Sequence, residues 1–342
     1  MKKKICVYSI CKNEEEHVDK WVDAHEEADL LIVTDTGSED NTVEKLKNRG
    51  VIVHETKLDF FRFDEARNIS LSNVPNDVDI CVCTDLDEIF ETGWRKKVEK
   101  AWKDGVSRLN YLCHLIYAEN NVLIGKMTTS KIHSRKNYKW RWPVHEWLVY
   151  DGEEAEKIIF VEDLISKHYR YNKKSNEFYL NLLEFAVKEM PDDSRMRYYL
   201  GREYMYKNEW QKCIDTLLPY FSIENGPWSE EKSGAMRHIA KSYKFLSNKK
   251  ECYKWFIKSM EETPNIRDPY IDLAFAAMEF EDFEISFLAF KLALNIKKII
   301  PAFEGSTYCF SKNINESFFD LCNELDIPEE KFKKYDFNFQ NI

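Results

Sequence analysis

The sequence contains no long hydrophobic run. No stretch approaches the roughly 20 apolar residues that a membrane-spanning helix needs. The first apolar segment, Ile5–Ile10, follows three lysines but is too short for a secretory signal peptide. We therefore expect no transmembrane segment and a cytoplasmic protein.

Basic residues are in the minority. Lysine and arginine number 50 against 60 aspartates and glutamates, which gives a formal net charge of −10. Nucleic acids and anionic membranes are bound by basic surfaces, so neither is an expected partner. Small molecules and proteins fit this composition better.

Paired cysteines are also absent. The nine cysteines are scattered, and none forms a CxxC pair. The spacing of Cys81 and Cys83 alternates as on a strand and does not match a metal-ligand set. Zinc sites and disulfide frameworks therefore fit poorly, and we expect reduced thiols in the core.

Two contrasting halves follow one another in the 342 residues. In the first, short apolar runs alternate with segments of helical periodicity, which predicts a parallel sheet with right-handed crossovers. From about residue 172 glycine almost disappears and helical periodicity dominates. We predict an α/β domain over residues 1–170 followed by an all-α domain over residues 171–342.

The first half is organised around Ile80–Glu88, an apolar run that ends in Asp85, Asp87 and Glu88. The carboxyl ends of strands are where open α/β sheets bind ligands. Carboxylates gathered there repel one another unless a cation or hydrogen-bond donors compensate them. The pattern favours a divalent metal that holds a phosphate. An acidic loop that caps the next helix is the alternative.

Four short segments, in this order, resemble the signature of family 2 glycosyltransferases with the GT-A fold: Ser9–Glu15, Asp35–Thr42, Ala66–Asn68 and Asp85–Glu88. Three of them directly follow predicted strands. The departures are small: many relatives have a second acid where Thr36 stands and an alanine where Leu86 stands.

The resemblance implies a nucleotide-sugar donor, UDP-sugar, bound by Ile10, Lys12, Asn13, Glu14, Asp35, Arg67, Asn68, Asp85, Leu86 and Asp87. Within that set it assigns Asp35 to the uracil, Asp85 to the ribose and Asp87 to the metal. Arg67 and Asn68 would lie near the base or the diphosphate. A guanidinium can bind phosphate oxygens bidentately, which suits Arg67 on independent grounds. The alternatives are helix capping for Asp35 and a solvated helix face for Arg67.

An aromatic-rich run, Tyr138–Leu148, contains the pair His145-Glu146. In the enzymes that the chain resembles, a His-Glu pair at this distance is common, which implies that Glu146 is the catalytic base and that tryptophans wall the sugar site. Ordinary core is the alternative for the tryptophans. Aromatic surroundings would raise the pKa of a carboxylate toward the range of a general base. Asp163 is the rival base.

The resemblance also implies a metal ligand from the end of the catalytic domain, where His168 stands. A neutral imidazole suits Mn²⁺ better than Mg²⁺. A surface histidine is the alternative.

The second half matches a tetratricopeptide template at Leu200-Gly201, Ile239-Ala240 and Leu273-Ala274. The spacings of 39 and 34 residues predict an insertion near residues 225–227. A half repeat over 176–189 would join the domains, and Ser317–Leu325 would form a capping helix. Stacked helix pairs form a concave surface for peptides or for self-association, and a helical buttress is the alternative.

The sequence therefore predicts a metal-dependent inverting glycosyltransferase of the hexosyltransferase type. It would move a sugar from a UDP-sugar to a glycan or peptide acceptor, and the helical domain offers a route to a homo-oligomer. A peptide-binding or self-associating scaffold with a catalytically weak transferase domain is the main alternative. A metal phosphohydrolase or nucleotidyltransferase is the other.

Overall fold

The structure is a computed structural model that describes residues 2–170, 177–223, 228–297, 309 and 311–328. The chain forms two compact units, Met1–Leu182 and Leu183–Ile342, and each is described by itself. The boundary expected after residue 170 adjoins residues 171–176, which lie outside the described ranges. An α/β region followed by an all-helical region is confirmed.

The first unit begins with alternating strands and helices: β1 (Ile5–Cys11), α1 (Val18–His25), β2 (Leu30–Asp35), α2 (Thr42–Asn48), β3 (Ile52–Glu55), α3 (Phe63–Ser72) and β4 (Ile80–Cys83). β1 pairs in parallel with both β2 and β4, and β2 pairs in parallel with β3. The parallel sheet predicted from the alternation is present in this part of the unit.

Beyond β4 the elements are β5 (Glu88–Phe90), α4 (Trp94–Ala101), β6 (Arg108–Tyr117), β7 (Val122–Ser134), β8 (Tyr138–Arg141), β9 (Trp147–Tyr150) and β10 (Ile158–Arg170). The main sheet runs β3-β2-β1-β4-β7-β6-β10-β5, and β8 with β9 forms a separate two-stranded sheet. β7 is antiparallel to both β4 and β6, so the main sheet is mixed. This mixed sheet does not by itself support the finer assignment to the GT-A fold.

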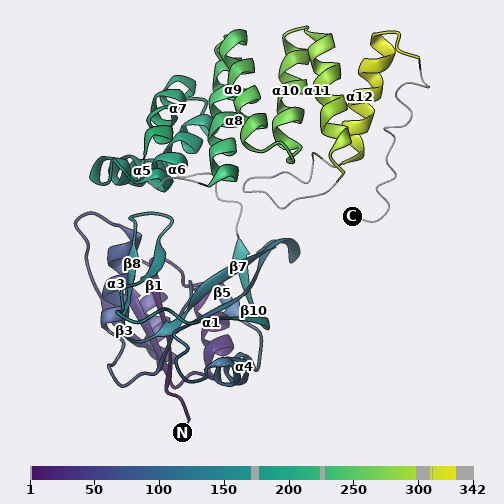
Figure 1. The fold of residues 1–342 in the computed structure, drawn as a ribbon. Helices are drawn as coiled ribbons and strands as arrows, with labels where there is room; N and C mark the ends of the chain where they lie inside the picture. The colour runs from purple at the N-terminus through teal and green to yellow at the C-terminus, as the bar shows by residue number, and fades with distance from the viewer. Residues whose placement is uncertain (1, 171–176, 224–227, 298–308, 310, 329–342) are drawn as a thin grey trace. The chain divides into compact units, whose positions relative to one another are not determined.

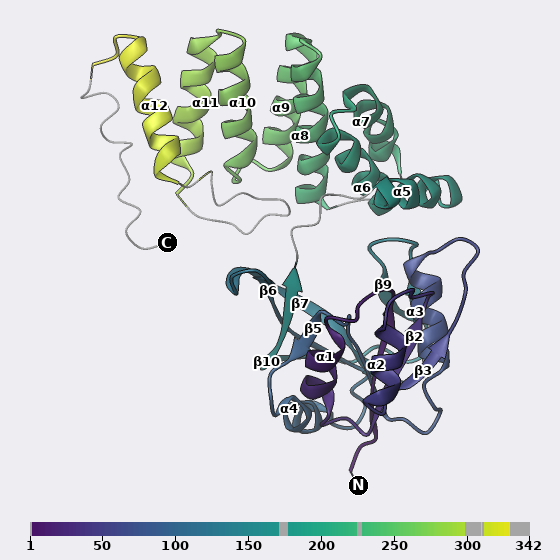
Figure 2. The ribbon, with the colours of Figure 1, turned by 180° about the vertical axis from the view of Figure 1, so that it is seen from behind.

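Both faces of the central strands are covered, as the predicted buried strand requires (Figures 1 and 2). On one face Val7 and Val82 pack in a core with Trp21 of α1. On the other face, Tyr8 and Cys83 of the same strands pack in a core with residues of α3 and β8. The alternation fixes the register of the strands, because a shift of one residue would exchange the two faces.

All nine cysteines are buried and free, as the sequence predicted. Burial raises the pKa of the Cys6 thiol to about 12 and that of Cys83 to about 11. Such thiols stay protonated and unreactive while the fold is intact.

The helices beyond the sheet are α5 (Glu177–Glu189), α6 (Ser194–Tyr206), α7 (Trp210–Leu217), the 3₁₀ helix η1 (Pro219–Ser222), α8 (Ser229–Phe245), α9 (Lys249–Glu262), α10 (Asp268–Glu279), α11 (Phe283–Asn295) and α12 (Lys312–Glu324). In the second unit α6 pairs with α7, α8 with α9 and α10 with α11 (Figure 1). None of the helices that the structure describes is both long and apolar enough to cross a bilayer.

The same turn joins the helices of each pair. Asn208, Ser247 and Glu281 occupy it with φ of 63°, 56° and 59°. In each case the next residue donates its backbone N–H to the carbonyl five residues earlier, at 2.8–2.9 Å, which closes the first helix of the pair. These three positions are 39 and 34 residues apart, the spacings found in the sequence. The insertion expected near 225–227 lies outside the described residues.

Candidate functional site

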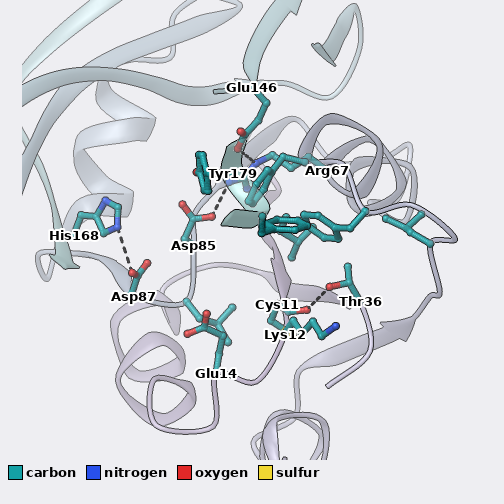
Figure 3. Close-up of a pocket in the computed structure, with 16 residues that line it drawn as sticks. Cys11, Lys12, Glu14, Thr36, Arg67, Asp85, Asp87, Glu146, His168 and Tyr179 are labelled. Carbon is teal, nitrogen blue, oxygen red and sulfur yellow. Dashed lines mark hydrogen bonds and ion pairs between the residues drawn. The ribbon is translucent and has the colours of Figure 1, made fainter. Parts of the chain in front are cut away.

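A cavity of about 720 Å³ opens at the carboxyl ends of β1 and β4 in the first unit (Figure 3). Its size is that of a small-molecule site. Its lining combines ionisable side chains with aromatic rings: Ile10, Cys11, Lys12, Glu14, Thr36, Leu58, Phe61, Phe63, Arg67, Asp85, Leu86, Asp87, Glu146, His168, Phe178 and Tyr179.

Most of the predicted site residues meet at this cavity. Those that line it are Ile10, Lys12, Glu14, Arg67, Asp85, Leu86, Asp87, Glu146 and His168. The fold brings them together because β1 and β4 are adjacent parallel strands whose ends point the same way. Their individual roles stay predictions.

The other predicted residues do not line the cavity, and two of them organise one loop. Asp35 is buried and accepts hydrogen bonds from the backbone N–H groups of Gly37 and Ser38, at 2.9 and 3.0 Å. Asn13 accepts one from the N–H of Glu39 at 2.8 Å. Both side chains shape the turn after β2, whereas the next helix, α2, has Asn41 at its N-cap position.

Asn68 exchanges two hydrogen bonds of 2.9 Å with the backbone of Trp140, which ties α3 to β8. Asp163 is exposed on β10, where its carbonyl oxygen accepts a hydrogen bond from Lys97. Neither residue is among those that line the cavity.

Arg67 contacts two carboxylates of the cavity and is only 4% exposed. Its Nε donates to Glu146 Oε1 at 2.6 Å, and its Nη2 donates to Asp85 Oδ1 at 2.8 Å. The guanidinium also lies 5.1 Å from the ring centroid of Trp140. These contacts hold the two carboxylates on either side of one buried cation, as the dashed lines in Figure 3 show.

Lys131 of β7 extends the cluster and was not among the predicted site residues. Its Nζ lies 3.2 Å from Asp85 Oδ2 and 2.9 Å from Glu88 Oε2. Burial would raise the pKa of Asp85, but Arg67 and Lys131 outweigh it and hold that pKa well below its ordinary value. The acidic strand end is therefore compensated by the protein's own cations.

Glu146 lies in the loop between β8 and β9. The sequence predicted aromatic surroundings for its carboxylate, whereas its direct partner is the guanidinium of Arg67. Two residues of this loop, Trp142 and His145, have φ of 74° and 53°, a region that costs free energy for non-glycine residues.

The tryptophans expected to wall the cavity do not line it. Trp140 is buried in the core and donates its indole N–H to Tyr8 Oη at 3.0 Å. Phenylalanines and a tyrosine form the aromatic lining instead: Phe61, Phe63, Phe178 and Tyr179. The alternative of ordinary core is correct for Trp140.

Asp87 and His168, the two expected metal ligands, lie side by side. His168 Nε2 is 3.3 Å from Asp87 Oδ2. Burial would lower the pKa of His168, but the hydrogen bond to Asp87 and the negative charges of Asp87, Asp85 and Glu88 together outweigh it and raise that pKa. Within the described residues no group of three or more His, Cys, Asp or Glu side chains could hold a metal ion. The expected Mn²⁺ site thus has at most this pair, and it stays a prediction.

No family model matches the sequence, and no curated protein matches it. Among solved structures, the MamA protein is 12% identical over 46% of this chain and 78% of its own, with a TM-score of 0.37. A MamA fragment from Desulfovibrio magneticus RS-1 is 11% identical over 46% of this chain and 80% of its own, with a TM-score of 0.36. PilW, a widely conserved type IV pilus biogenesis factor, is 10% identical over 47% of this chain and 67% of its own, with a TM-score of 0.39. TM-scores this low do not establish a shared function.

The comparisons do not support the interpretation as a family 2 glycosyltransferase: no family model matches the chain, and the solved structures above are MamA and PilW proteins. The expected enzyme, its UDP-sugar donor and its glycan or peptide acceptor are likewise unsupported. The physical reason lies in the motifs: short acidic and polar segments after strands recur wherever strand ends and helix starts need capping and charge balance. Here Arg67 and Lys131 supply that balance.

Proposed function

We propose that the protein is a non-catalytic scaffold whose tetratricopeptide-like helical unit binds an extended segment of a partner protein. The observation that carries the proposal is a continuous face of ordered charged and aromatic side chains across α6, α8 and α10. These helices are the first members of successive pairs, and each contacts the next. Stacked pairs of this kind use such a face to bind extended chains.

On α6 the face is basic and aromatic. Arg195, Tyr199, Arg202 and Tyr206 recur at spacings of four, three and four residues, which places them on one side of the helix. Arg202 lies 4.7 Å from the ring centroid of Tyr199, and Arg195 lies 6.0 Å from the same ring. The rings hold the guanidinium groups in place, and ordered guanidinium groups are well suited to carboxylates.

On α8 and α10 the same face is a row of ion pairs. Asp272 of α10 accepts from Arg237 at 2.6 Å and lies 2.9 Å from Lys241. One turn beyond Lys241 on α8, Lys244 is 2.7 Å from Glu279 of α10. The basic groups of α8 are thus paired with acidic groups of α10, and Arg195 and Arg202 of α6 lie against the ring of Tyr199. A partner segment that is acidic where it meets α6 would complement this pattern.

The test uses the full-length chain and labelled extended peptides of acidic, basic and neutral composition, with binding followed by fluorescence anisotropy. We expect acidic peptides to bind best. Because charge-assisted hydrogen bonds contribute about 1.5–3 kcal/mol, Arg202→Glu should weaken that binding at least about tenfold.

Lys250→Glu, which reverses a charge on the exposed start of α9, is the matched control and should bind as the wild type does. The proposal fails if no peptide class binds, or if Arg202→Glu and Lys250→Glu behave alike.

A further inference from the structure

One helix of the second unit exposes an apolar stripe. Ile285, Leu288 and Leu292 of α11 are 38%, 55% and 49% exposed. Their spacing of three and four residues places them on one face of the helix. The opposite face of α11 is buried, with Phe290 and Ala293 in the core. The stripe is therefore additional to the surface that holds the unit together.

The equivalent helix one repeat earlier shows that the fold does not require this stripe. α9 begins at Lys249 and α11 at Phe283, 34 residues later, and buried positions correspond: Cys252 to Ser286, and Phe256 to Phe290. At the positions of the stripe, α9 has Glu251, Lys254 and Lys258.

These α9 side chains are charged and engaged with their neighbours. Lys254 lies 2.8 Å from Glu251, and Lys258 lies 4.4 Å from the ring centroid of Trp255. The same face of two equivalent helices is thus solvated in α9 and apolar in α11. Exposed apolar patches on otherwise polar surfaces mark sites of interaction.

The charges beside the stripe indicate what covers it. Glu284 and Lys291 are seven residues apart, two helical turns, and so lie on the same side of the stripe. In an antiparallel pair of α11 helices with Leu288 at the two-fold axis, Ile285 of one copy meets Leu292 of the other. The two-fold rotation also places Glu284 of each copy opposite Lys291 of the other copy, so that the pair occurs twice in the dimer. The stripe is therefore complementary to itself in shape and in charge.

We propose that the protein forms a homodimer through α11, with two copies antiparallel about Leu288. This surface differs from the face of α6, α8 and α10, so the dimer leaves that face available for a partner segment. One pair of helices buries less than a standard interface, which makes the dimer weak and dependent on concentration.

The first test is sedimentation velocity of the full-length chain over a wide range of concentration. The wild type should pass from monomer to dimer as concentration rises. Leu288→Glu places two carboxylates against each other at the axis and should remain monomeric. Lys254→Glu introduces the same residue at the equivalent position of α9 and should dimerise as the wild type does. Far-ultraviolet circular dichroism checks that Leu288→Glu stays folded, as its exposed position predicts.

The second test addresses the register. Glu284→Lys should weaken the dimer by at least about tenfold, because two lysines then face each other on each side of the axis. Adding Lys291→Glu restores opposite charges and should restore the dimer. Failure of the exchanged pair to restore it would overturn the antiparallel arrangement.

A wild type that is monomeric throughout, or a Leu288→Glu variant that dimerises normally, would overturn the proposal. A monomeric wild type that dimerises when residues 329–342 are removed would assign the stripe to the chain's own tail, and would overturn it too. Peptide binding measured on Leu288→Glu should match the wild type, so a failure of the dimer is distinguishable from a failure of the scaffold.

Discussion

At the scale of single residues, the carboxylates around the cavity are compensated by cationic side chains of the same chain. Three carboxylates within four residues repel one another unless a cation or hydrogen-bond donors compensate them, and the sequence favoured a metal. The structure supplies Arg67 from α3 and Lys131 from β7. Both are covalently part of the chain, so they compensate Asp85 and Glu88 without a bound ion. Only Asp87 is left facing an imidazole, that of His168.

The expected Mn²⁺ can therefore be tested at one pair of side chains. If Asp87 and His168 bind the ion, adding the protein should reduce the electron paramagnetic resonance signal of free Mn²⁺. Asp87→Asn removes the charged ligand and should abolish the reduction. Asp163→Asn makes the same change on β10 and should leave it intact. A signal that the wild type does not change would remove the metal from this protein's chemistry.

Some site residues were predictable because local sequence determines their position. Asp85 and Asp87 follow directly after a buried strand, and a strand end fixes where the next residues point. Lys131 could not be predicted, because it is 46 residues from Asp85 in the sequence. The two side chains meet only because β7 pairs with β4. For Asp35 the sequence left donor contact and helix capping open, and in the structure its carboxylate accepts hydrogen bonds from Gly37 and Ser38 in the turn after β2.

At the scale of elements, the helix pairs repeat a left-handed turn without glycine. Asn208, Ser247 and Glu281 hold positive φ at the equivalent position, and Asp326 does so after α12, where Ile327 donates to Cys322 at 2.9 Å. Glycine is the residue that tolerates this conformation best. Each of these turns therefore stores a small amount of strain.

Replacing Glu281 by glycine should release that strain. A non-glycine residue in the left-handed region costs about 1–2 kcal/mol, and the extra freedom of glycine in the unfolded chain returns part of the gain. Glu281→Gly should thus stabilise the helical unit by about 0.5–1 kcal/mol in urea unfolding followed by circular dichroism. Lys254→Gly, in the middle of α9, should destabilise it by about 1 kcal/mol. If both variants lose stability equally, the turn is unstrained.

Helices and strands could be predicted where the apolar residues of a segment follow a single helical or strand period. The alternation before Glu88 gave the parallel strands in order. The short strand β5 and the hairpin of β8 and β9 were not predicted from the sequence. Mixed pairing in the sheet depends on long-range contacts, which local patterns do not encode.

At the scale of the whole molecule, two units with separate cores share one chain. The cores of the sheet contain residues of the first unit only. The helices of the second unit pack in succession, each pair against the next. Arrays of this kind lose structure locally more readily than a sheet that is closed on both faces.

The buried cysteines make it possible to measure which unit unfolds first. Five of the nine lie in the first unit and four in the second: Cys6, Cys11, Cys81, Cys83 and Cys113, then Cys213, Cys252, Cys309 and Cys322. An alkylating reagent adds one fixed mass to each thiol that becomes exposed. Intact-mass spectrometry at increasing urea concentrations therefore shows how many thiols have been exposed, and so in which order the two units unfold. We expect molecules with four labels to accumulate before molecules with nine. A direct step from none to nine would mean that the sheet and the helices open as one.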